Sequence, residues 1–224
     1  PPPPCFYKQK TAYESSLGLV GSEMCIRDRL KKAGLHSDIL RLNKTAAPLV
    51  FAEIKSKCNP EKTLLFYNHY DVQPIEPIDE WIHPPFSGKI IGTKIFGRGA
   101  SDDKGELITR IKAVESYLKE YGDVPCNIKF CIEGEEENGS KNIEAYLRKF
   151  KNKFSCNAVI WEFGYIDTKN RPVIGLGMKG LLYVELELKE SVRDVHSSFA
   201  VIIKNPVWRL IDALKTMRSD DAVS

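Results

Sequence analysis

The sequence Thr63-Leu64-Leu65-Phe66-Tyr67-Asn68-His69-Tyr70-Asp71 begins as a nearly continuous apolar run and ends in a histidine and an aspartate. Such a run is typical of a β-strand that is covered on both faces, as in the parallel sheets of α/β proteins. His69 and Asp71 follow at the carboxyl end of this strand, where open α/β sheets bind their ligands. The stretch therefore predicts both a buried strand and the place of a functional site.

Strands and helices alternate along the rest of the first 180 or so residues, a pattern typical of a doubly wound α/β domain with a mixed sheet. Residues 127–132 and 157–161 are apolar enough for two further strands, and residues 90–96 predict a hairpin broken by Gly92. Helices are expected over residues 106–121 and 140–150, because apolar residues recur there at helical spacing. These apolar residues are Leu107, Ile111, Val114 and Leu118 in the first segment, and Ile143, Leu147 and Phe150 in the second.

Two acidic segments follow later in the chain: Gly99-Ala100-Ser101-Asp102-Asp103-Lys104-Gly105 and Glu133-Gly134-Glu135-Glu136-Glu137-Asn138-Gly139-Ser140. Alone, each has an ordinary explanation, because Asp-Asp-Lys-Gly is a good helix start and consecutive glutamates usually mark a solvated loop. Together with His69 they predict the site of a two-metal hydrolase. Oxygen and imidazole ligands without a cysteine pair suit zinc, with manganese or cobalt as alternatives.

These two segments and Asn68-His69-Tyr70-Asp71-Val72-Gln73-Pro74 resemble the M20 family of metallopeptidases, from about Leu30 onward. The family includes carnosine dipeptidases, glutamate carboxypeptidases and amino-acid deacylases. The resemblance implies two zinc ions, bound by one carboxylate bridge and by separate ligands for each ion. The implied bridge is Asp102, the implied ligands of one ion are His69 and Glu162, and the implied ligand of the other ion is Glu137.

The resemblance also assigns roles to residues that do not bind metal. Glu136 aligns with the general base, which takes a proton from the attacking water and passes it to the leaving amine. Asp71 is expected to orient the imidazole of His69, as the outer partner of a metal-bound histidine does. His196 aligns with a histidine of an inserted lid that reaches the reacting carbonyl, although a polar histidine in a turn is the common alternative. A last histidine ligand is implied beyond Ser224.

Several of these assignments have a neighbouring alternative. The four glutamates between Glu133 and Glu137 could shift by one position, and the family's Glu-Glu-x-Gly-Ser spacing favours Glu136 and Glu137. Asp102 is favoured over Asp103 by the Asp-x-Lys-Gly spacing. A glutamate at position 162 resembles carboxypeptidases and deacylases more than aminopeptidases.

The ends of the chain lead to three expected segments. Residues 1–29 resemble translated sequencing adapter, as in Lys8-Gln9-Lys10-Thr11-Ala12-Tyr13-Glu14, so we expect them to be a non-native leader. Residues 30–179 are expected to form a partial zinc-peptidase catalytic domain that begins inside a helix ending near Gly34. Residues 180–224 are expected to begin an inserted α+β lid or dimerisation domain, with an alternating strand at 182–188 and a helix from about Pro206 to Met217. The chain resembles a family member truncated at both ends.

Composition excludes several other classes. The chain has 224 residues, 42% hydrophobic and 28% charged, which is enough for a folded core. No apolar run approaches the roughly 20 residues of a transmembrane helix, and a net charge of +3 without a basic stripe argues against nucleic acid. Six cysteines without C-x-x-C spacing favour free thiols in a reducing cytoplasm.

The sequence therefore predicts a cytoplasmic, zinc-dependent hydrolase of an amide bond in a small peptide, of dipeptidase or carboxypeptidase type. We expect no partner among nucleic acids or membranes, and a homodimer formed through the lid in the complete protein. One alternative is an N-acyl amino acid deacylase of the acetylornithine or succinyl-diaminopimelate type. Another is a catalytically dead fragment that acts as a binding or dimerisation module.

Overall fold

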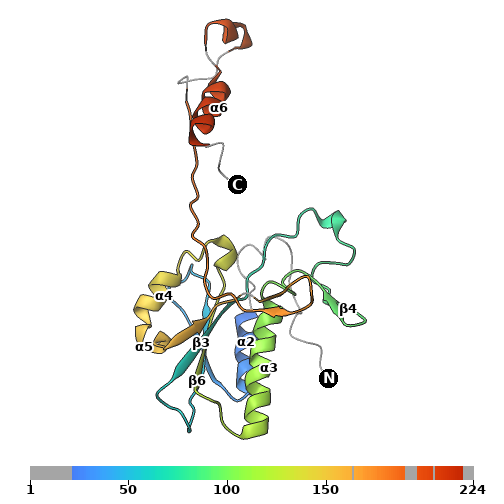
Figure 1. Cartoon of the computed structure of the whole chain (residues 1–224), viewed down its shortest axis with the longest axis vertical. Helices are drawn as coiled ribbons and strands as arrows, with labels where there is room; N and C mark the ends of the chain where they lie inside the picture. Colours follow the sequence, from blue (N-terminus) through green and yellow to red (C-terminus); the bar gives the residue numbers. More distant parts are fainter. Residues whose placement is uncertain (1–21, 163, 190–195, 204, 219–224) are drawn as a thin grey trace. The chain divides into compact units, whose positions relative to one another are not determined.

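The computed structural model describes residues 22–162, 164–189, 196–203 and 205–218 (Figure 1). The chain divides into two compact units, Pro1–Gly175 and Leu176–Ser224. The first unit holds the sheet and the segments that the sequence associates with metal.

A mixed five-stranded sheet forms the centre of the first unit, with the strand order β1-β2-β6-β3-β7. β3 runs parallel to both β6 and β7, whereas β1, β2 and β6 pair in antiparallel fashion. The predicted strand at residue 63 therefore has a parallel neighbour on each side, and the α/β class with a mixed sheet is confirmed. The strands are β1 (His36–Leu40), β2 (Leu49–Ile54), β3 (Thr63–His69), β6 (Asn127–Glu133) and β7 (Ala158–Ile160).

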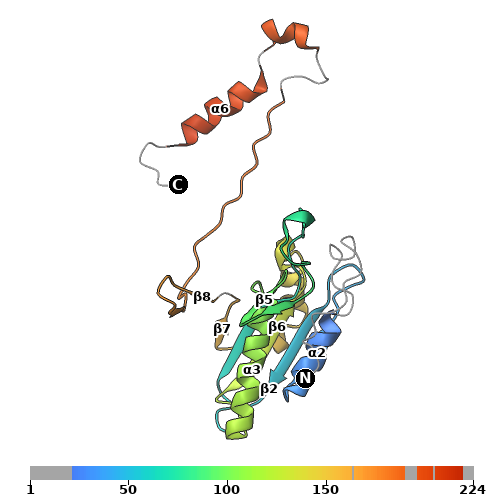
Figure 2. The ribbon, with the colours of Figure 1, turned by 90° about the vertical axis from the view of Figure 1, so that its right-hand side faces the viewer.

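Helices cover both faces of this sheet, and each face has its own apolar core (Figures 1 and 2). α2 (Ser22–Lys32) and α3 (Lys104–Tyr121) pack on one face, where Leu107 and Ile111 meet Phe130. α4 (Ile143–Lys149) and α5 (Lys151–Phe154) pack on the other, where Phe154 meets the ring of Phe51. Phe130 and its neighbour Cys131 belong to different cores, because successive side chains of a strand point to opposite faces.

The helix predicted after the Asp-Asp-Lys-Gly segment is confirmed as α3, which begins at Lys104 and ends before Gly122 at a φ of 70°. The helical spacing predicts that Leu147 lies on the buried face of α4, and this prediction was wrong. Leu147 is 40% exposed, whereas the adjacent Tyr146 is only 3% exposed and lies in the core. Tyr146 faces the core because its hydroxyl reaches the chain between β1 and β2, where it donates to the carbonyl oxygen of Ala47 at 2.9 Å.

Helix α2 includes residues 22–29, which the sequence predicts to belong to a non-native leader. Within it Leu30 is fully buried, and Arg29 forms an ion pair with Glu115 of α3 at 2.5 Å. The helix ends at Lys32. Gly34 follows with a φ of 93°, the left-handed conformation expected of a glycine that ends a helix. Residues 1–21 of the expected leader lie outside the described residues.

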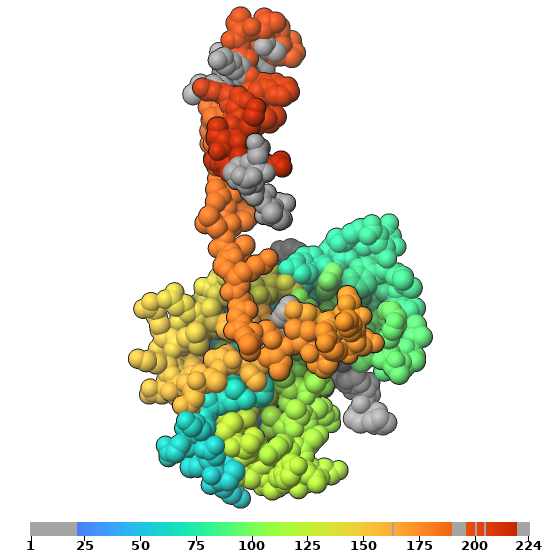
Figure 3. All heavy atoms as spheres, in the orientation of Figure 1, coloured from blue at the N-terminus to red at the C-terminus, as the bar shows by residue number. Residues whose placement is uncertain are grey.

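A long excursion connects β3 to α3 and projects from the first unit (Figure 3). It contains the short helix η1 (Ile78–Glu80) and the predicted hairpin, formed by β4 (Lys89–Ile91) and β5 (Lys94–Phe96). Trp81 fixes the first part of this loop, because its indole N–H donates to the carbonyl oxygen of Ile75 at 2.8 Å.

After β7 the first unit ends in a small ribbon of β8 (Tyr165–Ile166) and β9 (Pro172–Val173). In the second unit the predicted helix is confirmed as α6 (Pro206–Met217), whose first turn is capped by Asn205. The predicted strand at 182–188 was wrong, since the structure assigns no strand to the described residues 176–189. An alternating pattern needs a neighbouring strand to become a ladder, and none pairs with this segment in the described part of the chain. Among the described residues, no helix combines the length and apolarity needed to span a membrane.

Candidate metal centre

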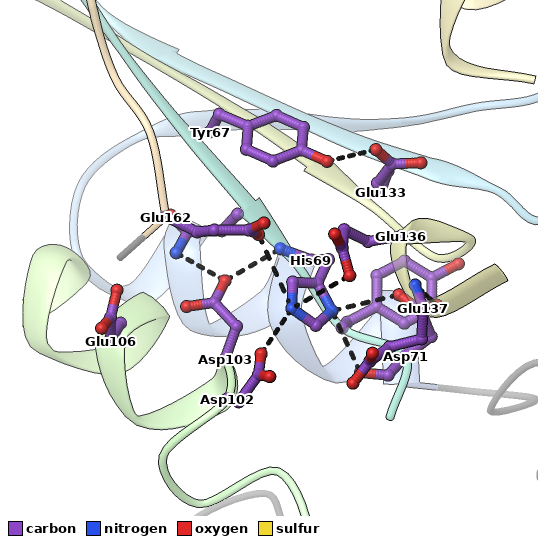
Figure 4. Close-up of polar contacts among 12 residues, drawn as sticks. Tyr67, His69, Asp71, Asp102, Asp103, Glu106, Glu133, Glu136, Glu137 and Glu162 are labelled. Carbon is purple, nitrogen blue, oxygen red and sulfur yellow. Dashed lines mark hydrogen bonds and ion pairs between the residues drawn. The ribbon is translucent and has the colours of Figure 1, made fainter. Parts of the chain in front are cut away.

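Four parts of the fold bring acidic side chains around one histidine at a single edge of the sheet (Figure 4). They meet there because β3, β6 and β7 are parallel, so that their carboxyl ends share that edge. The residues come from the end of β3, from the turn before α3, from η2 (Glu136–Asn138) after β6, and from the residues after β7. They are His69, Asp102, Asp103, Glu136, Glu137 and Glu162.

His69 is the centre of this arrangement and is only 1% exposed. Its Nδ1 lies 3.2 Å from Oδ1 of Asp71, while its Nε2 lies 2.8 Å from Oδ1 of Asp102. The same Nε2 is 3.6 Å from Oε2 of Glu162 and 3.9 Å from Oε2 of Glu136. Burial acts to lower the pKa of His69, but the hydrogen bond to Asp71 and the charge of Glu162 outweigh burial and raise it to about 10.

Two overlapping groups have ligand atoms close enough to hold a cation, with all the atoms of a group within 4.8 Å of one another. One group is His69 with Glu136 and Glu137, and the other is His69 with Asp103 and Glu162. The sequence predicted His69, Glu137 and Glu162 as ligands, and the structure brings all three to the same edge.

Asp102 and Asp103 differ sharply in their surroundings. The side chain of Asp102 is 71% exposed, whereas Asp103 is only 2% exposed. Oδ2 of Asp103 accepts hydrogen bonds from the side chain of Asn68 at 2.8 Å and from the backbone N–H of His69 at 2.9 Å. The sequence prefers Asp102 as the bridge, and this stays a prediction, since both aspartates lie beside the imidazole.

The donor set fits a cation for a reason visible in the structure itself. Among the buried side-chain atoms of the described residues, Oδ1 of Asp103 and Oε2 of Glu162 have no hydrogen-bond partner. A buried carboxylate oxygen without a donor is costly unless a proton or a metal ion neutralises it. Burial raises the pKa of Glu162 to about 8, despite the charge of His69.

Glu137 is held by two other residues of the site. Its backbone N–H donates to Oδ2 of Asp71 at 2.9 Å. Its carboxylate accepts hydrogen bonds from Gln73, through the side chain at 2.6 Å and the backbone N–H at 3.2 Å. Asp71 therefore contacts both His69 and the glutamate segment, and its expected role as an orienting residue stays a prediction.

In the sequence, Glu133 is only a register alternative to Glu136 and Glu137, and the structure gives it different surroundings. It is 4% exposed and accepts hydrogen bonds from the hydroxyl groups of Tyr67 and Ser140, the latter at 2.8 Å. Burial raises its pKa. The ring of Tyr67 stacks on Trp161, with centroids 3.8 Å apart. The sequence alone could not show that Glu133 is buried and hydrogen-bonded, because these contacts require Tyr67 and Ser140 to lie beside it.

His196 belongs to the second unit, so its expected reach toward the reacting carbonyl stays a prediction. Its own contacts are local. Its Nδ1 accepts from the backbone N–H of Ser198 at 3.2 Å at the start of η3 (Ser197–Val201).

Comparison with known sequences agrees with this geometry. The profile described as peptidase family M20/M25/M40 matches residues 65–219. The β-Ala-His dipeptidase of Mus musculus is 34% identical over 76% of this chain and 35% of its own length. The Cys-Gly metallodipeptidase of Schizosaccharomyces pombe is 37% identical over 70% of this chain and 34% of its own length. The chain thus spans about a third of the length of these two relatives.

Two solved structures are also similar to this chain. An M20 family metallo-carboxypeptidase from Sulfolobus solfataricus has a TM-score of 0.78 and 42% sequence identity, covering 88% of this chain and 44% of that chain. Human carnosine dipeptidase 1 has a TM-score of 0.56 and 29% identity, covering 68% of this chain and 36% of that chain.

Proposed function

The chain belongs to peptidase family M20/M25/M40, and we propose that it carries the metal centre of a dizinc hydrolase that cleaves an amide bond in a small peptide. The observation that supports this best is the buried imidazole of His69, surrounded by carboxylates from separate elements. Two of these carboxylates, Asp103 and Glu162, bury an oxygen that accepts no hydrogen bond. Such a cluster is stable only when protons or cations neutralise it.

In this proposal His69 and Glu162 hold one zinc ion and Glu137 helps to hold the other, with Asp102 between them. Asp103 is the alternative bridging carboxylate, since its Oδ1 belongs to the buried part of the cluster. When bound, the ions would lower the pKa of a water molecule and stabilise negative charge on the carbonyl oxygen. Manganese or cobalt would suit the same oxygen and imidazole ligands.

Glu136 is the proposed general base. Its side chain is 34% exposed, so it can meet both the site and an incoming substrate. Burial raises its pKa; the charge of His69 opposes this effect, whereas the charges of Glu137 and Asp71 add to it. A carboxylate with a raised pKa accepts a proton more readily, and we propose that Glu136 takes one from the attacking water and delivers it to the leaving amine.

Small peptides are the proposed substrates, because the relatives described above are named dipeptidases and a carboxypeptidase. N-acyl amino acids are the alternative within the same chemistry. We include His196 in the proposal as a residue of a lid that also pairs two subunits. A cytoplasmic location is proposed as well, and the free thiols of Cys58, Cys126, Cys131 and Cys156 suit a reducing compartment.

Zinc binding is the experiment that tests the core of this proposal. The purified chain is stripped of metal and titrated with zinc, and His69→Ala is expected to lose at least one ion. Glu136→Gln is expected to keep its zinc but to lose turnover of Cys-Gly and β-Ala-His by about 100-fold or more. Glu144→Gln is the control, because Glu144 is an exposed residue of α4.

The same experiment separates the alternatives. Turnover of N-acetylated amino acids in place of both dipeptides would favour the deacylase. A chain that binds no zinc at micromolar concentrations would contradict the metal centre and favour a binding or dimerisation module.

A further inference from the structure

Arg110, in the second turn of α3, joins the ends of two neighbouring strands. One of its terminal nitrogens, Nη1, donates to the carbonyl oxygen of Tyr67 at 2.7 Å and to Oδ1 of Asn68 at 3.1 Å. The other, Nη2, donates to the carbonyl oxygen of Trp161 at 2.6 Å. The guanidinium therefore connects the residues immediately before His69 with the residue immediately before Glu162.

Glu106 lies one turn earlier on the same helix and fixes the other side of Glu162. Its Oε1 accepts a hydrogen bond from the backbone N–H of Gly164 at 2.9 Å. Its Oε2 lies 3.5 Å from Nη2 of Arg110, at the i,i+4 spacing of a helix. Figure 4 shows Glu106 on α3, below Glu162. The backbone is thus attached to α3 both before and after Glu162.

The segment that carries Glu162 is short and is also held by the stacking of Trp161 on Tyr67. β7 has only three residues, all exposed, and among the strands of the described residues it pairs only with β3. Without the attachments to α3, this short strand at the edge of the sheet would leave the side chain of Glu162 free to turn toward solvent.

We infer that Arg110 and Glu106 are positioning residues that hold Glu162 opposite His69 in readiness for a cation. The inference rests on the proposed metal role of Glu162 and adds two residues that do not bind metal themselves. The side chain of Arg110 is 12% exposed, and its planar fork satisfies carbonyl oxygens on two strands at once. A lysine would keep the charge but could not reproduce this fork.

The test measures zinc affinity by competition with a chelator, using the whole chain and the variants Arg110→Met, Arg110→Lys and Glu162→Gln. Both substitutions of Arg110 are expected to weaken zinc binding by about 10- to 100-fold, as the loss of an outer partner of a ligand does. Arg148→Met is the matched control, because Arg148 forms an exposed i,i+4 pair with Glu144 on α4. Circular dichroism checks that each variant keeps its helices.

Two further measurements distinguish positioning from a general structural effect. Combining Arg110→Met with Glu162→Gln is expected to add little to the loss caused by Glu162→Gln alone, whereas combining it with Glu137→Gln is expected to multiply the two losses. In the metal-free chain, the amide proton of Gly164 is expected to exchange faster in Arg110→Met and in Glu106→Ala than in Arg148→Met.

The possible results separate this inference from the proposed function. If Glu162→Gln weakens zinc binding but both Arg110 variants bind normally, the positioning role is wrong and the metal centre stands. Normal zinc binding by Arg110→Lys with loss in Arg110→Met would show that only charge matters and would also overturn positioning. If zinc binding is unchanged in both His69→Ala and Glu162→Gln, the proposed metal centre fails, and the positioning role fails with it.

Discussion

Asp71 and His69 are joined through the ring nitrogen that faces away from the carboxylate cluster, with Oδ1 of Asp71 3.2 Å from Nδ1 of His69. The pairing leaves Nε2 directed at the remaining acidic residues, which is the orientation that a metal ligand needs. A partner on one ring nitrogen sets the proton position on the ring.

Asp71→Asn should lower the pKa of His69 below its value of about 10, since the hydrogen bond to this carboxylate is the main contact that raises it. Zinc affinity should fall by about 10- to 100-fold, because the ring is no longer oriented by a charged partner. The pKa is measured by NMR titration of the metal-free chain, and the affinity by chelator competition. Asp79→Asn, at an exposed position of η1, is the control, and an unchanged pKa in Asp71→Asn would count against the orienting role.

Zinc binding should release protons and should tighten as pH rises. The pKa of His69 is raised from 6.5 to about 10 and that of Glu162 from 4.5 to about 8, so both groups carry protons near pH 7 in the metal-free chain. Both must lose them to bind a cation, and release of about two protons per site is expected near pH 7.

Calorimetry in buffers of different ionisation enthalpy counts these protons.

The raised pKa of His69 also affects the free energy of unfolding. A pKa that is higher in the folded state contributes stability that is complete below pH 6.5 and is lost as pH rises through 10. Zinc affinity that does not change between pH 6 and 8 would contradict this protonation scheme.

Tyr67→Phe should destabilise the first unit by about 1–3 kcal/mol, because Glu133 would lose a hydroxyl donor while staying buried. The stacked contact between Tyr67 and Trp161 would be kept, since phenylalanine preserves the ring. Urea unfolding followed by circular dichroism measures the change. Tyr121→Phe, on a residue that is 67% exposed, is the control and should change the free energy of unfolding little.

Gly134→Ala should destabilise the chain by about 1–3 kcal/mol or more, as overpacking of a core does. A methyl group at this position would lie 2.3 Å from the ring and hydroxyl atoms of Tyr70. Tyr70 has little room to move, because it is 1% exposed and its hydroxyl donates to the carbonyl oxygen of Pro48 at 2.6 Å. Gly180→Ala is the control, since a methyl group there would have no heavy atom within 4 Å. Equal melting temperatures for the two variants would contradict the packing argument.

The sequence was sufficient for features that depend on local spacing. The apolar run before His69, the helical spacing of Leu107 and Ile111, and the helix expected from about Pro206 to Met217 each match an element that the structure contains. Side-chain periodicity is a direct consequence of backbone geometry, so a few residues are enough to show it. The family resemblance likewise rested on short motifs that survive without knowledge of the fold.

Tyr146, Glu133 and Arg110 show where the sequence was not sufficient. Burial of Tyr146 in place of Leu147 depends on a hydrogen bond to a distant loop. The sequence does not distinguish Glu133 from its neighbouring glutamates, because what sets it apart is its burial beside the hydroxyl group of Tyr67. The contacts of Arg110 join segments about 40 and 50 residues away, so no spacing rule within α3 could predict them.

By itself, then, the sequence determined the α/β class, several of its strands and helices, and the set of residues from which a metal centre can be built. The tertiary structure alone decided which side chain faces which. It placed Asp103 in the buried part of the cluster beside the exposed Asp102, gave Asp71 contacts with both His69 and Glu137, and attached the backbone around Glu162 to α3. The physical reason is that an element's type follows from neighbours along the chain, whereas burial, charge and hydrogen bonding at the site follow from neighbours in space.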